Sequence, residues 1–162
     1  MQPSAKCLFY WMHVFFVGGV VNMHVDRFLW TLRRTTFTYA AVHEYLRPWE
    51  WPTCQGGKNG AAAFSSDRCK SSLEAQQLKV TASEGRSMLL PFAHFVRQSL
   101  LQPHSDPKWH DHALVICHLS DAVQELEAAA KGSCDVAALR HHLQQHMELF
   151  TRCCVYGAFD WD

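Results

Sequence analysis

Histidine is the residue type in this chain that is best placed to do chemistry. The 162 residues include eleven histidines. Six of them lie on two segments near the C-terminus: His110, His112 and His118 on the first, and His141, His142 and His146 on the second. His142 and His146 are four residues apart, so on a helix they would share the face that a zinc ion can bridge. A third ligand would have to come from His118, Cys117 or His110.

We favour a different interpretation of these histidines, a solvated or half-buried polar face. The pair lacks the glutamate of the His-Glu-x-x-His motif, and no Asp or Glu lies between His142 and His146 to act as a base. The sequence therefore predicts no metal and no other cofactor. His118, His142 and His146 are the candidate ligands should a metal bind.

Other patterns of catalytic sites are missing from the sequence. The segment Thr53–Gly60 is rich in glycine, but Lys58 is followed by Asn59, so the residue order of a phosphate-binding loop is not met. No Gly-x-Ser-x-Gly turn occurs, and no Ser or Cys stands in a recognisable triad. We expect no catalytic residue and no enzyme activity.

Charge and cysteine content say little about a partner. Lys plus Arg equals Asp plus Glu at 15 each, whereas a DNA-binding domain usually carries a basic excess or patch. Arg33 and Arg34 form a short basic pair that could contact nucleic-acid phosphate, or could simply suit the C-terminal end of a helix. The seven cysteines show no Cys-x-x-Cys spacing, so we expect free thiols in a reducing, intracellular compartment.

The elements that would position these residues are predicted to be helical. Apolar residues at helical spacing predict a first helix over Trp11–Leu32, in which Gly18-Gly19 indicates a break or the close approach of another backbone. Residues 8–10 could be a short strand stub. The apolar stretch Cys7–Val21 covers 15 residues. A bilayer span needs roughly 20, so we favour a buried helix over a membrane segment.

Two further helices are predicted before the middle of the chain. One covers Thr38–Leu46, with Thr35 or Thr36 as its cap and Pro48 just beyond its end. The connection that follows, residues 49–80, is rich in loops and includes a short helix near 66–76.

The C-terminal half is predicted to hold three helices. Thr81 and Glu84 form a capping box that opens a helix in which Pro91 should produce a kink. Asp106 and Pro107 start a long helix over about 108–131, which Gly132 ends. Ser133 is predicted to cap the last helix, about 134–156. So short a turn between the last two helices requires an antiparallel hairpin.

The fold class predicted from these elements is mainly α, a helical bundle with a C-terminal antiparallel helix hairpin. We expect one mostly helical domain over 1–162. Its parts are the N-terminal helices of 1–48, the loop-rich connection of 49–80, the three-helix region of 81–157 and a tail of 158–162.

Several short blocks of the sequence resemble a known family. Tyr10-Trp11-Met12-His13, followed by Gly18-Gly19, resembles the Asp-x-Met-His…Gly stretch of DDE-type DNA transposases of the CACTA class and of related transposon-encoded proteins. Later blocks resemble the same group in the same order. These are Val42-His43-Glu44-Tyr45-Leu46…Trp51-Pro52, Lys70-Ser71-Ser72-Leu73, Thr81-Ala82-Ser83-Glu84-Gly85…Leu89-Leu90-Pro91 and His142…His146…Phe150…Tyr156-Gly157.

The resemblance implies a protein that has lost its catalytic activity. In such transposases three carboxylates on an RNase-H-like core hold two divalent metal ions, and a helical insertion follows the second Asp. This chain would start just before that Asp and end before the third carboxylate. Tyr10 occupies the position of the Asp, and a neutral phenol is a poor ligand for Mg²⁺. The chain would then be catalytically incomplete and, if transposase-derived, nuclear.

Two functions follow as expectations. The first is residual DNA contact, or self-association through exposed apolar helix faces around Trp11–Leu32. The alternative is a small all-α protein-interaction module, soluble or N-terminally membrane-anchored, with no link to DNA.

Overall fold

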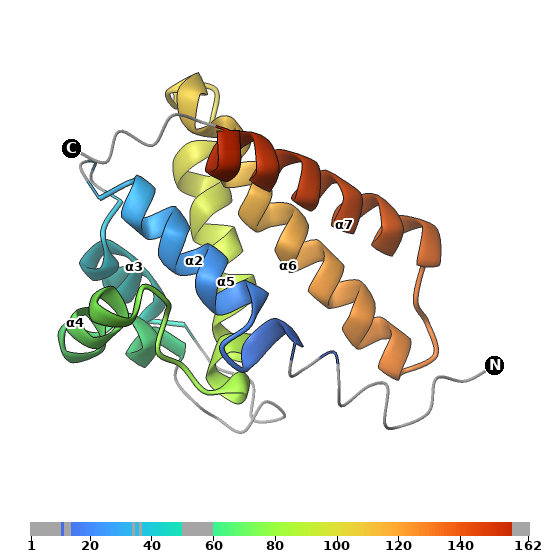
Figure 1. Cartoon of the computed structure of the whole chain (residues 1–162), viewed down its shortest axis with the longest axis horizontal. Helices are drawn as coiled ribbons and strands as arrows, with labels where there is room; N and C mark the ends of the chain where they lie inside the picture. The colour runs from blue at the N-terminus through green and yellow to red at the C-terminus, as the bar shows by residue number, and fades with distance from the viewer. Residues whose placement is uncertain (1–10, 12–13, 34, 36, 50–59, 157–162) are drawn as a thin grey trace. The chain divides into compact units, whose positions relative to one another are not determined.

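The computed structural model describes residues 11, 14–33, 35, 37–49 and 60–156, except for the side chains of 154–156. Within these residues the chain forms six α-helices and no strand, which confirms the mainly α fold class (Figure 1). The predicted strand stub at residues 8–10 lies outside the described part. The chain divides into two compact units, Met1–Phe95 and Val96–Asp162, with the division inside helix α5.

The first predicted helix is broken at its paired glycines. Helix α2 covers Val20–Thr31, and Gly19 is its N-cap. Gly18 adopts a left-handed φ of 62°, which glycine takes at little cost. A Cβ on Gly19 would lie 1.9 Å from the carbonyl oxygen of Val14, so the chain folds back on its own preceding turn at this point. Both expectations for the glycine pair, a break and a close backbone approach, are therefore met together.

Helix α3 covers Tyr39–Leu46 and starts later than its predicted cap. Thr38 is the N-cap, and its side chain accepts a hydrogen bond from the backbone N–H of Ala41. The predicted cap at Thr35 or Thr36 is wrong. The hydroxyl of Thr35 instead donates to the carbonyl of Leu32 and accepts from the N–H of Phe37, so it holds the turn between the two helices.

The core of the first unit is built around a chain of phenylalanine rings. Phe28 on α2 lies edge-on to Phe37 and to Phe92, with ring centroids 5.3 and 5.8 Å apart. Phe92 also stacks on Phe64, at 5.5 Å. Phe64 ends the 3₁₀ helix η2, Gly60–Phe64, and all four rings are buried. Large aromatic side chains at these positions supply much of the apolar area that holds this unit together.

Helix α4 and most of helix α5 complete this unit, and the start of α5 follows its predicted signal. Helix α4 covers Ser66–Ala75 and ends at Gln76 in a left-handed conformation. Helix α5 covers Ala82–Leu100 and passes through Pro91. Its capping box is formed as predicted: the N–H of Thr81 donates to Glu84 Oε2 at 2.8 Å, and the N–H of Glu84 donates to the Thr81 hydroxyl.

The second unit contains the predicted antiparallel hairpin. Helix α6 covers His110–Ala130 and helix α7 covers Val136–Phe150, and the two lie side by side (Figure 1). Asp106 caps a 3₁₀ turn, η3, at Pro107–Trp109, rather than α6 itself. After Phe150 the backbone continues as a π-helical segment, η4, Thr151–Tyr156.

The turn between the two helices of the hairpin differs from its prediction in one respect. Gly132, with a φ of 78°, ends α6 as expected, and the N–H of Ser133 reaches back to the carbonyl of Ala128 in a Schellman motif. Ser133 is not the cap of α7. Its hydroxyl also donates to Ala128, and Asp135 caps α7 by accepting from the N–H groups of Ala137 and Ala138.

No helix in the described part of the chain is both long enough and apolar enough to cross a membrane.

Candidate metal centre

Two histidines and one aspartate meet on the facing sides of α6 and α7. His118 Nδ1 lies 3.1 Å from His142 Nδ1, and His142 Nδ1 lies 4.0 Å from Asp121 Oδ2. One ligand atom from each of the three lies within 4.8 Å of the others. Two nitrogens on one tetrahedral zinc ion are separated by about 3.3 Å, given Zn–N bonds of about 2.0–2.1 Å. The 3.1 Å approach of the two rings is a hydrogen bond, and it is close to the separation that one ion requires. We call His118, Asp121 and His142 the His-Asp cluster.

Among the described residues, the carboxylate of the His-Asp cluster is held by hydrogen bonds to one of its two oxygens. Asp121 Oδ1 accepts from Arg97 at 2.7 Å and from the side-chain amide of Gln124 at 3.4 Å. These two contacts fix the carboxylate and leave Oδ2 directed to the histidine side. A metal-binding carboxylate is commonly oriented in this way, with one oxygen on the ion and the other on a neighbouring donor.

The protonation state of His118 favours metal binding. Burial, together with the neighbouring His142, lowers the pKa of His118 below its usual range. The imidazole of His118 is then neutral near pH 7, which is the form that offers a nitrogen lone pair to a metal ion.

The structure does not bring all the predicted candidates together. His146 lies outside the His-Asp cluster: its ring is buried, and its Nδ1 lies 2.9 Å from the carbonyl oxygen of Val115. The cluster pairs His142 with His118 on the facing helix rather than with His146 four residues along its own helix. Of the proposed third ligands, His118 is present. Cys117 is buried, and burial raises the pKa of its thiol to about 11. His110 is not part of the cluster either.

Sequence reasoning missed Asp121. The available signal was its position three residues after His118, which places both on one face of a helix. The position of Asp121 in the structure is explained by the guanidinium of Arg97. Its ion pair with Asp121 holds the half-buried carboxylate beside the histidines. His141 lies at the edge of the cluster, with its ring centroid 5.5 Å from that of His142, and is exposed.

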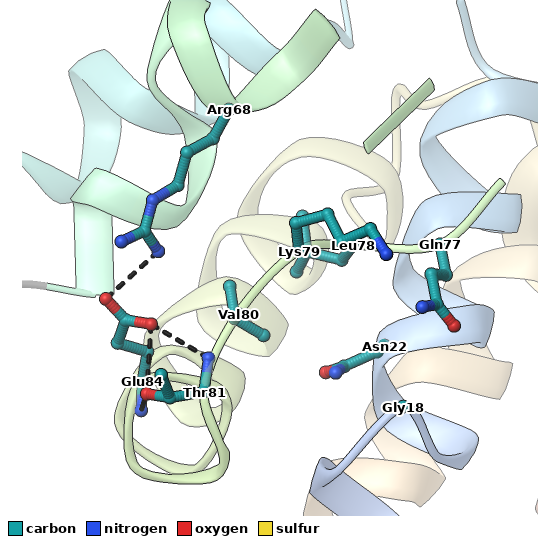
Figure 2. A pocket seen from close by; sticks show the side chains of 9 residues that line it. All are labelled: Gly18, Asn22, Arg68, Gln77, Leu78, Lys79, Val80, Thr81 and Glu84. Carbon is teal, nitrogen blue, oxygen red and sulfur yellow. Dashed lines mark hydrogen bonds and ion pairs between the residues drawn. The ribbon is translucent and has the colours of Figure 1, made fainter. Parts of the chain in front are cut away.

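A polar hollow in the first unit is a second candidate site. It has a volume of about 260 Å³ and lies where α2, α4 and the start of α5 meet (Figure 2). Figure 2 shows Arg68 and Glu84 directed at each other on one side of the hollow, with Asn22 reaching in from α2. Arg68 lies 3.0 Å from Glu84, and Thr81 donates to the same carboxylate. These groups are engaged in holding the start of α5, so we assign them a structural role.

The charge of Glu84 is expected to contribute to stability in a pH-dependent way. Burial opposes its ionisation, but hydrogen bonds from Arg68 and Thr81 outweigh burial and lower its pKa. Its contribution is therefore complete above the carboxyl pKa of the unfolded chain, about 4.3, and is lost as pH falls through the lower pKa of the folded protein. Glu84→Gln keeps a capping side chain without the charge, and should lower the free energy of unfolding at pH 7 by about 1 kcal/mol.

Urea unfolding at pH 7 and pH 3 measures this effect. The difference between the wild type and Glu84→Gln should shrink at pH 3. Glu74→Gln is the matched control, because Glu74 is exposed on α4, and it should change stability little at either pH. A difference for Glu84→Gln that stays constant with pH would show that its carboxylate charge does not stabilise the fold.

The basic pair predicted to contact nucleic acid is only half described. Arg33 donates to the carbonyl of Trp30 at 2.9 Å, and its guanidinium lies 4.0 Å above the centroid of the Trp30 ring. Arg34 lies outside the described residues, as does Tyr10. Contact with nucleic acid and the loss of a catalytic Asp at position 10 both stay predictions.

Asp26 is a buried carboxylate that the sequence analysis did not single out. It accepts a hydrogen bond of 2.6 Å from the hydroxyl of Tyr39. Burial raises the pKa of Asp26, and the Tyr39 hydrogen bond offsets part of that rise. The pair ties α2 to the start of α3, and we assign it a role in packing. The cysteines whose side chains are described, Cys69, Cys117, Cys134 and Cys153, are free thiols, as predicted.

The His-Asp cluster is therefore the candidate site that the described residues support best. No protein-family model, no curated protein and no solved structure gives a significant match to this chain. Its function therefore has to be inferred from the residues of the cluster.

Proposed function

We propose that this protein binds one divalent transition-metal ion in its C-terminal helix hairpin. His118 Nδ1, His142 Nδ1 and Asp121 Oδ2 would be the protein ligands. The observation that carries the proposal is the approach of two imidazole nitrogens to 3.1 Å beside a carboxylate oxygen that no other described side chain holds. Imidazole and carboxylate ligands suit Zn²⁺ and its neighbours in the first transition row.

The ion would join two helices that are otherwise linked by a short turn. Two of its ligands come from α6 and one from α7. Binding would therefore link the two helices near their middle, in addition to the turn that links them at one end. A three-ligand set leaves one position of a tetrahedral ion for water. The positive charge of Arg97 beside Asp121 opposes a second cation, so we expect a dissociation constant in the micromolar range.

Isothermal titration with Zn²⁺ of metal-free, reduced full-length protein tests the proposal. The wild type should bind one ion per chain. His142→Gln removes a ligand and should abolish this stoichiometric binding. His141→Gln is the matched control, since it makes the same change at the adjacent, exposed residue of the same helix, and it should bind as the wild type does.

Two results would contradict the assignment. One is equal binding by His142→Gln and the wild type, and the other is equal loss in both variants, because either would place the ion on other histidines of this chain. The visible spectrum of the Co²⁺ form adds a check on the ligands. Nitrogen and oxygen ligation is expected, and a thiolate charge-transfer band would indicate Cys117 instead. Circular dichroism of each variant confirms that the helices are kept.

The relation to CACTA-type transposases is a separate proposal. The order of the resembling blocks supports it, and it predicts at most residual DNA contact in a catalytically incomplete protein. Metal binding by the His-Asp cluster is compatible with this relation and does not depend on it, because His118, Asp121 and His142 lie far from Tyr10 in the sequence.

A further inference from the structure

The His-Asp cluster is open to solvent beside a cationic side chain. The side chain of His142 is 24% exposed, that of Asp121 is 28% exposed and that of Arg97 is 34% exposed. The guanidinium of Arg97 donates from Nη2 to Asp121 Oδ1, and it makes no further hydrogen bond or ion pair to the described residues. Because a guanidinium has five N–H groups, Arg97 keeps donors for a partner that comes from solvent.

The proposed ion and Arg97 would leave a net positive charge at this opening. A divalent ion brings two positive charges and Arg97 brings one, whereas the carboxylate of Asp121 supplies a single negative charge. The imidazoles of the cluster are neutral when they bind a metal ion. Glu125 lies one turn further along α6, where its carboxylate accepts a hydrogen bond from the N–H of Asp135. The excess of positive charge favours the binding of an anion.

One small anion could reach both the ion and the guanidinium. The ion would bind Oδ2 of Asp121, and Arg97 binds Oδ1 of the same carboxylate at 2.7 Å. The oxygens of a carboxylate are about 2.2 Å apart and a metal–oxygen bond is about 2.1 Å long, so the ion and Nη2 of Arg97 are at most about 7 Å apart. An oxyanion with one oxygen on the ion and another on the guanidinium spans up to about the same distance.

We propose that the ion and Arg97 together bind one small oxyanion, and that the ion and the anion strengthen each other's binding. This inference rests on the proposed metal site. One oxygen of the anion would take the coordination position that the three protein ligands leave to water, and a second oxygen would accept from Arg97. The anion would offset the positive charge of Arg97 that otherwise opposes the ion. Linkage then requires that each tightens the other by the same factor.

Isothermal titration of the metal-free protein with Zn²⁺, in the presence and absence of millimolar acetate, tests the inference. Sodium perchlorate, which does not coordinate metal ions, keeps the ionic strength equal in the two titrations. Acetate should tighten the binding of Zn²⁺ about tenfold. A parallel titration in sulfate distinguishes the two shapes of oxyanion. A larger effect of acetate identifies a carboxylate as the preferred ligand, and a larger effect of sulfate identifies a tetrahedral oxyanion.

Substitutions of Arg97 test its part in the site. Arg97→Met removes the guanidinium and should reduce the effect of acetate to about twofold or less, whereas Arg97→Lys keeps a cationic donor and should retain part of the effect. Arg140→Met is the matched control. It removes the same charge from an exposed residue, about 160° around α7 from His142, and it should respond to acetate as the wild type does. Circular dichroism shows whether each variant keeps its helices.

The outcomes for the ion and for the anion can be told apart. No stoichiometric binding of Zn²⁺ in any of the buffers would overturn the metal site and this inference with it. Stoichiometric binding whose affinity is unchanged by acetate and by sulfate would overturn the anion alone. An acetate effect as large in Arg97→Met as in the wild type would show that the anion binds the ion without Arg97, and would overturn the shared site.

Discussion

Replacing Phe92 by alanine is expected to lower the free energy of unfolding by about 3–5 kcal/mol. Phe92 is fully buried on α5, and its ring contacts two others, edge-on to Phe28 on α2 and stacked on Phe64 in η2. Alanine would remove the ring on which these separate elements converge, and the partners could not close the cavity without moving their helices. Chemical denaturation monitored by circular dichroism measures the loss.

Leu90→Ala provides the control for this change. Leu90 lies two residues away on the same helix but is 46% exposed, so its truncation should cost less than about 1 kcal/mol. Equal losses in the two variants would mean that α5 is stabilised by helix propensity and that the ring contacts of Phe92 add nothing.

Replacing Gly19 by alanine is expected to cost about 3 kcal/mol, at the upper end for an added methyl group. The new Cβ would lie 1.9 Å from the Val14 carbonyl oxygen and 2.6 Å from its carbon. Both are backbone atoms, so no side-chain rotation relieves the overlap. The turn that carries Val14 would have to move away from the start of α2. Movement of that turn would also pull on the hydrogen bond from Asn22 Nδ2 to the carbonyl of Phe16.

The neighbouring glycine distinguishes steric overlap from backbone conformation. A Cβ on Gly18 would meet only Gln77 Oε1, at 3.9 Å, but the φ of 62° is strained for alanine. Gly18→Ala should therefore cost about 1 kcal/mol. The comparison uses the same denaturation experiment. A Gly19→Ala variant no less stable than Gly18→Ala would contradict the close backbone approach.

The helices were predictable where the signals are local. The apolar spacing of α5, α6 and α7, the Thr81–Glu84 capping box and the stop at Gly132 depend on residues within one or two turns of each other. The apolar spacing alone does not give the start of α2, although the paired glycines did indicate a break there. Apolar residues continue through Val14–Val17, but Gly18 and Gly19 turn the chain sharply between two helical segments.

Caps were harder to predict because several residues near a helix start can serve. Ser133 and Asp135 both suit the N-cap position of α7, and so do Thr35 and Thr38 near α3. Which residue becomes the N-cap depends on which side chain is not already hydrogen-bonded in the preceding turn. Ser133 is engaged in closing the end of α6, and Thr35 in the turn after α2, so the later residue caps in both cases.

The histidine-rich hairpin was predictable, but which of its residues meet in the His-Asp cluster was not. A helical wheel gives the relative directions of His142 and His146 and not the rotation of α7 against α6. That rotation places His146 in the interior, on the carbonyl of Val115, and turns His142 to His118. The contribution of Asp121 depends on Arg97, 24 residues earlier in the chain, and no short-range pattern connects them.

The hydrogen bond from the N–H of Asp135 to Glu125 Oε2, 3.0 Å long, ties the first residue of the turn into α7 to the last part of α6. It sets the register of the two helices. One residue more or less between Gly132 and Asp135 would rotate α7 by about 100° and shift it by about 1.5 Å, which would carry His142 away from His118 and Asp121. Exposed turns usually accept insertions and deletions. In this protein the length of the turn fixes the geometry of the proposed metal site, so relatives that keep His118, Asp121 and His142 should also keep its length.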